Sequence, residues 1–399
     1  MIDIVFNKKE FEYDAYTLIK AFYPQEEVSI LYEGEEKTEA FQEKEEAFLV
    51  VKITYNKEDT RLEVLKNKET VFEETIFLAS DDERKERKNK LKQALYRGLS
   101  KETKKVLPWG DLTGIRPTKI AMGLIESGMS NVETAEFMRN TYYTSNEKTA
   151  LAITIANRER ALLADIDYKN GYSLYVGIPF CPSICLYCSF SSYPLAKWRD
   201  KVDAYLDALC KELTYIGETM KVRTLDTIYI GGGTPTTLEP EQLERLLSHI
   251  ECCFPTREVK EYTIEAGRPD SITREKLEVI RKYPVTRISV NPQTMNQATL
   301  DLIGRRHTVE DTRHAFALAR ECGFDNINMD LIVGLPGECA KDVQKTLEEV
   351  KKMEPDSLTV HSLAIKRATR LHLFQDRYQE MSFENNQEIM DMAMNCARE

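Results

Sequence analysis

The sequence predicts an α/β protein in which a series of parallel strands and helices follows a smaller α+β domain. From about residue 171, short β-branched runs alternate with longer amphipathic stretches, which is typical of βα units. The residues before about 80 instead contain strand-like runs with alternating faces around one early helix. The chain has 399 residues, enough for two domains. No apolar run approaches the roughly 18 residues that a membrane span needs.

The N-terminal part divides into two predicted regions. Residues 1–80 are expected to form a small α+β domain of unknown role, with one helix at 13–23. Residues 81–165 are expected to be a helical connecting region that begins with a charged surface helix at 81–99. A loop rich in glycine and proline interrupts this region at 108–119. The expected strands of the first region are "DIVF", "VSILY", "AFLVVKITY", "RLEVL" and "VFEETIFL".

Residues 166–375 carry the regular βα pattern. Helix-like stretches at 196–220 and 271–282 separate some of the strands, and the second is expected to begin with a cap at Ser271. Repeated βα units predict parallel strands with right-handed crossovers. Their periodicity fits an open doubly wound sheet and a partial barrel equally well. The expected strands are residues 172–178, 227–232, 261–266, 286–291, 326–333 and 356–363.

Composition and charge argue against several classes of protein. The formal net charge of −11 disfavours nucleic-acid binding through bulk electrostatics, and the first residues lack the apolar segment of a secretory signal. Nine cysteines, an odd and unevenly spaced set, argue against a disulfide framework and indicate a reducing, cytoplasmic compartment. Six of them are expected to be small buried apolar residues. These six are Cys210, Cys252, Cys253, Cys322, Cys339 and Cys396.

Cys181, Cys185 and Cys188 form a separate group in a loop that is expected after the first strand of the βα series. Zinc sites and iron–sulfur cubanes usually have four protein ligands, so three thiolates on a cubane would leave one iron open to a small molecule. The amino and carboxylate groups of S-adenosylmethionine suit that open position. Two alternatives remain: a zinc site completed by a distant histidine or cysteine, and three cysteines that only pack.

Further candidate residues follow successive strands. Gly231, Gly232 and Gly233 come after the second strand of the βα series, where missing side chains let backbone amides approach a ligand. Other residues lie at the expected carboxyl ends of later strands, where parallel α/β folds gather their ligand sites. Each one alone is compatible with a solvated loop or a structural ion pair, but their recurrence on successive units favours a site. They are Glu265 with Arg268, Gln293, Arg305, Asp330 and Ala364.

The cysteine spacing, the aromatic Tyr187 and the position after a first strand together resemble the radical S-adenosylmethionine (SAM) superfamily. The segments "YVGIPFC", "GGGTPT", "RISVNPQ", "RRH" and "INMDLIVGLPGE" resemble the oxygen-independent coproporphyrinogen III oxidases and their relatives. Within that family, "LPWGDLTGIRPTK" and "CLYCSFSSYP" are most similar to the HemZ-type coproporphyrinogen dehydrogenases. The resemblance covers about residues 85–375. It implies a partial (β/α)6 radical-SAM barrel with a [4Fe–4S] cluster that reduces S-adenosylmethionine.

The resemblance also implies roles for individual residues. Cys181, Cys185 and Cys188 would hold the cluster. Asp330 suits the ribose hydroxyls of S-adenosylmethionine as a double acceptor, and Arg305 suits the carboxylate as a forked donor. The residues expected to hold S-adenosylmethionine are Tyr175, Tyr187, Gly232, Gly233, Thr234, Glu265, Gln293, Arg305, Asp330 and Ala364.

The implied enzyme is an oxidoreductase of heme and porphyrin biosynthesis that converts coproporphyrinogen III to protoporphyrinogen IX without oxygen. Two propionate side chains would each lose a hydrogen, carbon dioxide and one electron and become vinyl groups. Two S-adenosylmethionine molecules, an electron acceptor and a flavodoxin- or ferredoxin-like donor would be needed, and neither nucleic acid nor a membrane is an expected partner. The alternatives are a heme chaperone, a radical methyltransferase or heme-opening enzyme, and a non-enzymatic zinc or iron–sulfur protein.

The sequence departs from the family near the expected cofactors. Gly177 stands where relatives often have histidine, and Ser189 follows the cluster where many oxidases have a fourth cysteine. Both departures concern the identity of the substrate more than the radical chemistry. Residues 376–399 are expected to be a C-terminal helix of a truncated chain or of one that covers the porphyrin pocket differently. His307, His361 and the basic segments "LDLIGRRHT" and "IKRATR" are weaker candidates for substrate contacts.

Overall fold

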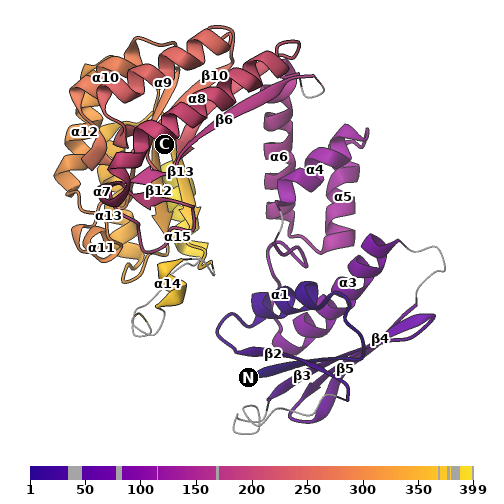
Figure 1. The fold of residues 1–399 in the computed structure, drawn as a ribbon. Helices are drawn as coiled ribbons and strands as arrows, with labels where there is room; N and C mark the ends of the chain where they lie inside the picture. Colours follow the sequence, from indigo (N-terminus) through magenta and orange to yellow (C-terminus); the bar gives the residue numbers. More distant parts are fainter. Residues whose placement is uncertain are drawn as a thin grey trace. The chain divides into compact units, whose positions relative to one another are not determined.

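The protein folds as two compact units, each with its own hydrophobic core (Figure 1). Unit 1 is Met1–Asp165 and unit 2 is Ile166–Glu399. The finer division of the chain at residues 80 and 375 stays a prediction. The structure is a computed structural model, and it describes residues 1–34, 47–77, 83–114, 116–167, 170–366, 369–374, 378 and 387–397.

Unit 1 contains a mixed five-stranded sheet, which confirms the predicted α+β fold of its first part. Its elements are β1 (Ile2–Phe6), α1 (Glu12–Phe22), β2 (Val28–Tyr32), β3 (Leu49–Tyr55), β4 (Asp59–Lys66), β5 (Glu69–Phe77) and α3 (Arg84–Thr103). The strand order is β2-β1-β3-β4-β5, with β1 parallel to both of its neighbours and the remaining pairs antiparallel. Leu18 of α1 and Leu95 of α3 are fully buried against Ile4 and Ile53 of the sheet. The apolar side of α3 therefore packs on the sheet, whereas a surface helix was predicted.

Among the described residues, unit 1 continues with α4 (Pro117–Glu126), α5 (Asn131–Tyr142) and α6 (Asn146–Leu162). Helix α4 begins inside the predicted loop 108–119, because a proline at the first helical position loses no hydrogen bond. Ser130 and Glu133 form a capping box at the start of α5. Within the described ranges, no helix combines the length and the apolar character needed to cross a bilayer.

Unit 2 is built on a parallel sheet of six strands, as predicted. The strands are β6 (Tyr172–Ile178), β9 (Leu225–Gly232), β10 (Glu261–Gly267), β11 (Arg287–Gln293), β12 (Ile327–Val333) and β13 (Ser357–Ser362). Their order in the sheet is their order in the chain, and every neighbouring pair is parallel. A doubly wound sheet reverses its strand order at a switch point. The sheet is therefore singly wound, which resolves the ambiguity that periodicity left.

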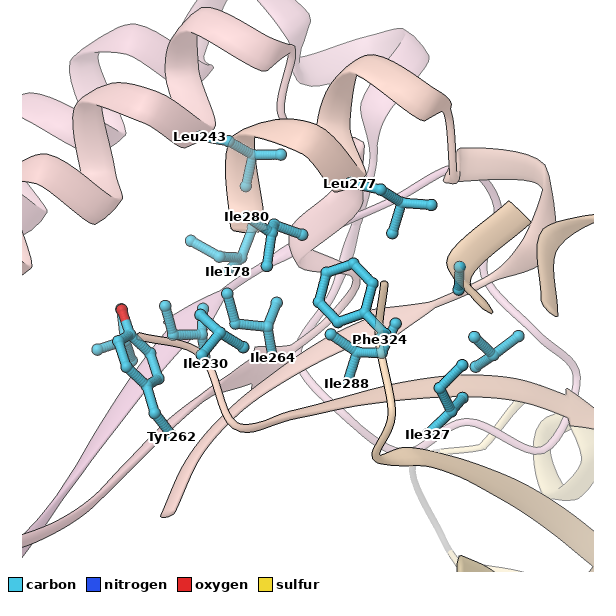
Figure 2. Close-up of a cluster of buried hydrophobic side chains, with 14 of the residues drawn as sticks. Ile178, Ile230, Leu243, Tyr262, Ile264, Leu277, Ile280, Ile288, Phe324 and Ile327 are labelled. Carbon is cyan, nitrogen blue, oxygen red and sulfur yellow. The ribbon is translucent and has the colours of Figure 1, made fainter. Parts of the chain in front are cut away.

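The two faces of this sheet differ in polarity. Ile230, Ile264, Ile288 and Ile327 lie opposite one another in register on four adjacent strands. Figure 2 shows them below Leu277 of the covering helix α10 (Arg274–Arg281), in the main core of unit 2. Side chains alternate between faces along a strand, so the neighbours of these isoleucines point to the opposite side. These neighbours are Tyr229, Glu265, Ser289 and Asn328.

The helices that carry Leu300 and Leu371 pack in a separate apolar cluster with Leu186, and the others cover the apolar face. One or two helices follow each strand in turn. They are α7 (Leu195–Trp198), α8 (Val202–Thr219), α9 (Pro240–Cys253), α10 (Arg274–Arg281), α11 (Gln297–Leu302), α12 (Val309–Glu321), α13 (Ala340–Met353), α14 (Arg370–Leu373) and α15 (Gln387–Cys396). Helix α15 lies within the segment 376–399 and buries Ile389 and Ala393 in the core of unit 2. The predicted helix at 196–220 is interrupted by a 3-10 turn at Arg199–Lys201.

The predicted cap at Ser271 is wrong. The Ser271 hydroxyl donates to the Arg268 carbonyl oxygen at 2.8 Å within a 3-10 turn. Helix α10 is capped instead by Thr273, whose hydroxyl accepts the Lys276 N–H. The 3-10 turn at Pro269–Ser271 therefore moves the start of the helix two residues further along the chain.

The prediction for the six scattered cysteines holds only for Cys210, which is buried. Cys252 is exposed, because the buried face of α9 is formed by Leu243, Leu246, Leu247 and Ile250. The remaining four are half-buried, and none of the nine cysteines forms a disulfide.

Candidate active site

The polar face of the six-stranded sheet borders a cavity of about 300 Å³ in unit 2. The cavity lies where β9, β10 and β11 end, which is the usual place for ligands in parallel α/β folds. All residues that were predicted to hold the cluster or S-adenosylmethionine line this cavity, except Tyr175. The residues brought together are Cys181, Cys185, Cys188, Tyr187, Gly232, Gly233, Thr234, Glu265, Gln293, Arg305, Asp330 and Ala364.

The cysteine loop is fixed to its surroundings at both ends. Cys181 lies in the short strand β7 (Phe180–Cys181), which pairs with β8 (Tyr193–Pro194). Within the loop, the Ser183 hydroxyl donates to the Gly304 carbonyl oxygen at 2.8 Å. The backbone N–H of Leu186 donates to the Ile303 carbonyl oxygen at 2.9 Å. These bonds hold the three thiols toward one cavity.

The chemistry of this donor set fits an iron–sulfur cluster. Burial raises the pKa of the Cys181 and Cys188 thiols, so binding a cationic iron centre would release protons from them. In the part of the chain that the structure describes, no three His, Cys, Asp or Glu side chains lie close enough to hold one metal ion. All three thiols line the same cavity, as thiolates that hold one cluster must.

The glycine loop that ends β9 approaches the cysteine strand closely. The N–H of Gly233 donates to the Ile178 carbonyl oxygen at 2.7 Å, and the N–H of Thr234 donates to the Phe180 carbonyl oxygen at 2.8 Å. A Cβ atom on Gly233 would lie 2.5 Å from the Phe180 oxygen and 3.0 Å from the Cys181 sulfur. Gly232 has a φ of 105°, a conformation that side chains rarely adopt. Both positions therefore require glycine.

Glu265 is a half-buried carboxylate in the wall of the cavity. Burial raises its pKa to about 7, the hydrogen bond from the Tyr229 hydroxyl opposes this shift, and the nearby Asp330 carboxylate adds to it. Asp330 accepts a hydrogen bond from the Asn328 amide at 2.6 Å, which orients its carboxylate. Tyr175 stacks on Tyr229 with ring centroids 5.9 Å apart, but it is 62% exposed and lies outside the cavity wall.

Strand β11 places two unsatisfied polar groups beside the cavity. A bulge between Val290 and Gln293 ends in Gln293, whose φ of 71° is uncommon for a residue with a side chain. Among the described residues, the Gln293 Oε1 and the Arg305 Nε find no hydrogen-bond partner although both are buried. Buried polar groups are normally paired, so these atoms indicate that a polar ligand belongs here.

Arg305 is buried yet remains charged. Its guanidinium donates to the Asn291 carbonyl oxygen. Although burial disfavours the charge, the neighbouring Tyr187 and Cys185 hold the pKa of Arg305 above its usual value. A buried guanidinium with free donor capacity suits a carboxylate ligand.

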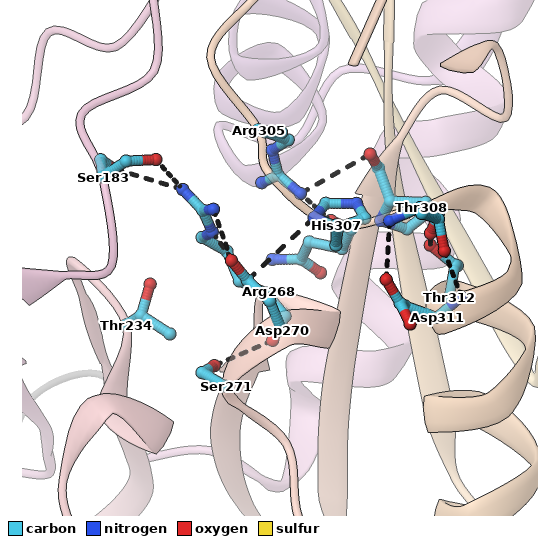
Figure 3. Close-up of polar contacts among 12 residues, drawn as sticks. Ser183, Thr234, Arg268, Asp270, Ser271, Arg305, His307, Thr308, Asp311 and Thr312 are labelled. Atoms are coloured by element: carbon cyan, nitrogen blue, oxygen red, sulfur yellow. Dashed lines mark hydrogen bonds and ion pairs between the residues drawn. The ribbon is translucent and has the colours of Figure 1, made fainter. Parts of the chain in front are cut away.

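Arg268 connects the cysteine loop to the turn after β10 (Figure 3). It donates to both carboxylate oxygens of Asp270, at 3.0 and 2.7 Å, and to the Ser183 hydroxyl at 2.7 Å. Its Nη1 also lies 3.9 Å from the Cys185 sulfur. From the sequence, Arg268 was predicted only as a neighbour of Glu265, and Asp270 was not predicted, although both lie in "GRPD" at the end of the strand.

The two candidate histidines differ in position. His307 is 1% exposed and lies outside the cavity wall, with its Nδ1 4.0 Å from Asp270. Burial lowers its pKa to about 4, so the ring is neutral. His361 lines the cavity. Other residues that line the cavity but were not predicted from the sequence include Ser183, Ser192, Asn291, Ile332 and Leu363.

Known proteins share this fold and these motifs. Residues 175–350 match the Radical SAM superfamily. The oxygen-independent coproporphyrinogen-III oxidase-like protein HemZ of Bacillus subtilis is 37% identical over 385 residues, which cover 94% of this chain and 75% of that protein. The heme chaperone HemW of Bacillus subtilis is 37% identical over 211 residues, which cover 50% of this chain and 55% of the chaperone.

Among solved structures, coproporphyrinogen III oxidase (HemN) from Escherichia coli, a radical SAM enzyme, matches with a TM-score of 0.50 and 29% identity. That match covers 59% of this chain and 54% of HemN. Against HemW and HemN the match thus spans about half of the relative's length. The match to HemZ extends over nearly the whole chain. This chain belongs to the radical SAM superfamily, in the family of the oxygen-independent coproporphyrinogen III oxidases and their relatives.

Proposed function

We propose that the protein is a radical SAM oxidoreductase that decarboxylates coproporphyrinogen III to protoporphyrinogen IX without oxygen. In each of two rounds, one propionate side chain would lose a hydrogen atom, carbon dioxide and one electron and become a vinyl group. An external acceptor would take the electron, and a flavodoxin- or ferredoxin-like protein would supply the reducing electron. The observation that carries the proposal is the convergence of three thiols, Glu265 and Arg305 on one cavity.

Family membership implies a [4Fe–4S] cluster and S-adenosylmethionine, which when bound supply a 5′-deoxyadenosyl radical. Cys181, Cys185 and Cys188 would hold the cluster. Arg305 would donate to the carboxylate of S-adenosylmethionine, and Asp330 would accept from its ribose hydroxyls. Ile332 lines the cavity and packs on an apolar cluster behind it, which would restrict water near reactive groups.

The choice of a tetrapyrrole rests on the family and on charge at the exposed part of the cavity. Lys366 and His361 are exposed and line the cavity. A cationic ammonium at this place suits the propionate carboxylates of the substrate. The carbonyl oxygen of Gly177, where relatives often have histidine, accepts a hydrogen bond from the Tyr205 hydroxyl.

The proposal is tested by an anaerobic assay of the iron–sulfur-reconstituted full chain with S-adenosylmethionine, dithionite and coproporphyrinogen III. Chromatography measures 5′-deoxyadenosine, and fluorescence measures protoporphyrin after oxidation. We expect both products, and we expect both to be lost in Cys185→Ala together with most of the bound iron. The matched control is Cys252→Ala, which removes an exposed thiol on α9 and should leave both products unchanged.

If 5′-deoxyadenosine formed without protoporphyrin, the protein would still be a radical SAM enzyme, but coproporphyrinogen III would not be its substrate. A second candidate, a heme chaperone, is favoured by one observation, the 37% identity to HemW over half of the chain. It predicts stoichiometric heme binding without protoporphyrin formation. Spectrophotometric titration of the same preparation with heme separates the two functions.

A further inference from the structure

Unit 1 contains a cavity of about 590 Å³ that the radical chemistry does not use. Its wall comes from α1, α3, α4, α5 and the loop before α4, all within unit 1 (Figure 1). The volume falls in the range of small-molecule sites, roughly 300–1,000 Å³. The loop belongs to the segment "LPWGDLTGIRPTK", which no proposed step of the reaction explains.

The charge of this cavity is opposite to that of the whole chain. The chain has a formal net charge of −11, whereas the wall combines five cationic side chains with only two carboxylates. Lys88 lies 3.6 Å from Asp14, the one ion pair of the wall that joins described residues. The cationic side chains are Lys85, Lys88, Lys92, Arg116 and Lys119.

Lys92 and Asp111 are the buried charged side chains of the wall, at 7% and 1% exposure. Lys92 donates to the Thr113 hydroxyl at 3.3 Å. Asp111 Oδ1 finds no hydrogen-bond partner among the described residues. A buried carboxylate oxygen without a partner is costly, so a ligand that brings an N–H or O–H group would stabilise it.

The loop is folded specifically to place Asp111 there. Gly110 has a φ of 60°, and a Cβ atom on it would lie 1.8 Å from the Tyr142 carbonyl oxygen. That same oxygen accepts the N–H of Asp111 at 2.9 Å. The wall also contains three apolar side chains, Ile120, Leu124 and Phe137.

We propose that this cavity binds a small organic anion that carries carboxylate or phosphate groups and a hydrogen-bond donor on an apolar body. The lysines at the exposed part of the cavity would take the anionic groups, and Asp111 would accept the donor. The carboxylates of a tetrapyrrole and the phosphates of a nucleotide both meet this description. This cavity lies within unit 1 and shares no lining residue with the cysteine cavity. The proposed binding can therefore be tested separately from the proposed reaction.

The test is equilibrium dialysis of the full chain against three probes: coproporphyrin III for carboxylates, ATP for phosphates, and pyrophosphate as an anion without an apolar body. Lys88→Gln/Lys119→Gln removes two cations from the wall. Lys57→Gln/Lys101→Gln makes the same charge change outside it, at exposed positions of unit 1. We expect saturable binding of coproporphyrin III or ATP that weakens by roughly tenfold or more in the first pair and stays unchanged in the second.

Three results would overturn the proposal. The first is no saturable binding of either organic probe below about 1 mM, the weak limit for a specific small-molecule site. The second is binding that both variant pairs weaken equally or that neither weakens, since the ligand would then lie elsewhere. The third is pyrophosphate binding as tightly as the organic probes, because the apolar wall would then contribute nothing. Circular dichroism of both variants checks that the fold is retained.

Discussion

The two cavities of this protein are built in different ways. In unit 2, backbone groups at the ends of parallel strands set the geometry, through a glycine loop, a β-bulge and the hydrogen bonds of the cysteine loop. In unit 1, side chains from helices line a wider space, and most of its cations are partly or fully exposed. We therefore expect the glycine loop of the first cavity to tolerate no added side chain, whereas the helical part of the second wall should respond mainly to changes of charge.

The largest effect is expected from Gly233→Ala. The added Cβ would meet two backbone oxygens, at 2.5 and 2.9 Å, so the glycine loop or the cysteine strand must move. A displacement of about 1 Å at such a site costs roughly 100-fold in rate, so we expect a loss of this order in 5′-deoxyadenosine formation. The measurement is single-turnover cleavage of S-adenosylmethionine by the reconstituted protein.

Gly123→Ala is the matched change in unit 1. A Cβ atom there has nothing within 4 Å, and the residue lies inside α4. Alanine should therefore stabilise unit 1 by about 0.5–1 kcal/mol through its higher helix propensity. If both alanine variants were equally tolerated, the contrast between a backbone-built cavity and a side-chain-built cavity would be wrong.

Arg268→Gln tests the connection between the cysteine loop and the rest of unit 2. The substitution removes the bidentate bond to Asp270 and leaves a partly buried carboxylate without its cation. We expect a loss of about 3 kcal/mol in the free energy of unfolding of unit 2, measured by urea titration. Arg274→Gln removes an exposed pair with Glu321 and should cost less than about 0.5 kcal/mol. Equal losses for the two variants would contradict the assigned role of Arg268.

The Glu265 carboxylate should make the affinity for S-adenosylmethionine depend on pH. Its pKa is raised to about 7, and we expect binding to require the ionised form, which accepts hydrogen bonds with both oxygens. Affinity measured by dialysis should therefore be about tenfold weaker at pH 6 than at pH 8. Glu265→Gln should bind weakly at both values. A wild-type affinity that does not change between pH 6 and pH 8 would rule out this role.

Much of unit 2 could be predicted from the sequence because its signals are local. Each strand is a short β-branched run, and the cysteine and glycine motifs directly follow strands. Sequential strand order then brings the motifs to one cavity without further information. Tyr175 shows the limit, because its exposed position depends on stacking against a neighbouring strand. Arg268 and Asp270 were undervalued because a bidentate pair across one turn has no distinct sequence pattern.

The cavity of unit 1 could not be predicted, since its parts carry no local signal. Lys85, Lys88 and Lys92 recur at helical spacing, but such a pattern usually marks a solvated face. Only the tertiary structure shows that Lys92 is buried and that Gly110 packs against Tyr142. The sequence therefore identified "LPWGDLTGIRPTK" only as a motif that resembles the family, without a physical role.

Asp111→Asn tests whether the floor of that cavity is as buried as the structure indicates. Burial raises the pKa of Asp111 from 3.8 to about 7, against the opposing attraction of Lys92. Between these values the folded protein holds a proton that the unfolded chain has released, so its stability falls as the pH rises from about 4 to 7. Asparagine cannot ionise, so the variant does not lose stability over this pH range.

Fluorescence of Trp109 in a Trp198→Phe background follows the unfolding of unit 1. The variant should match the wild type at low pH and unfold roughly 10 °C higher at pH 8, because a pKa raised from 3.8 to about 7 corresponds to about 4 kcal/mol. If the variant were no more stable than the wild type at pH 8, burial of the ionised Asp111 carboxylate would not destabilise the folded state. The unpaired oxygen would then give no reason to expect a ligand in this cavity.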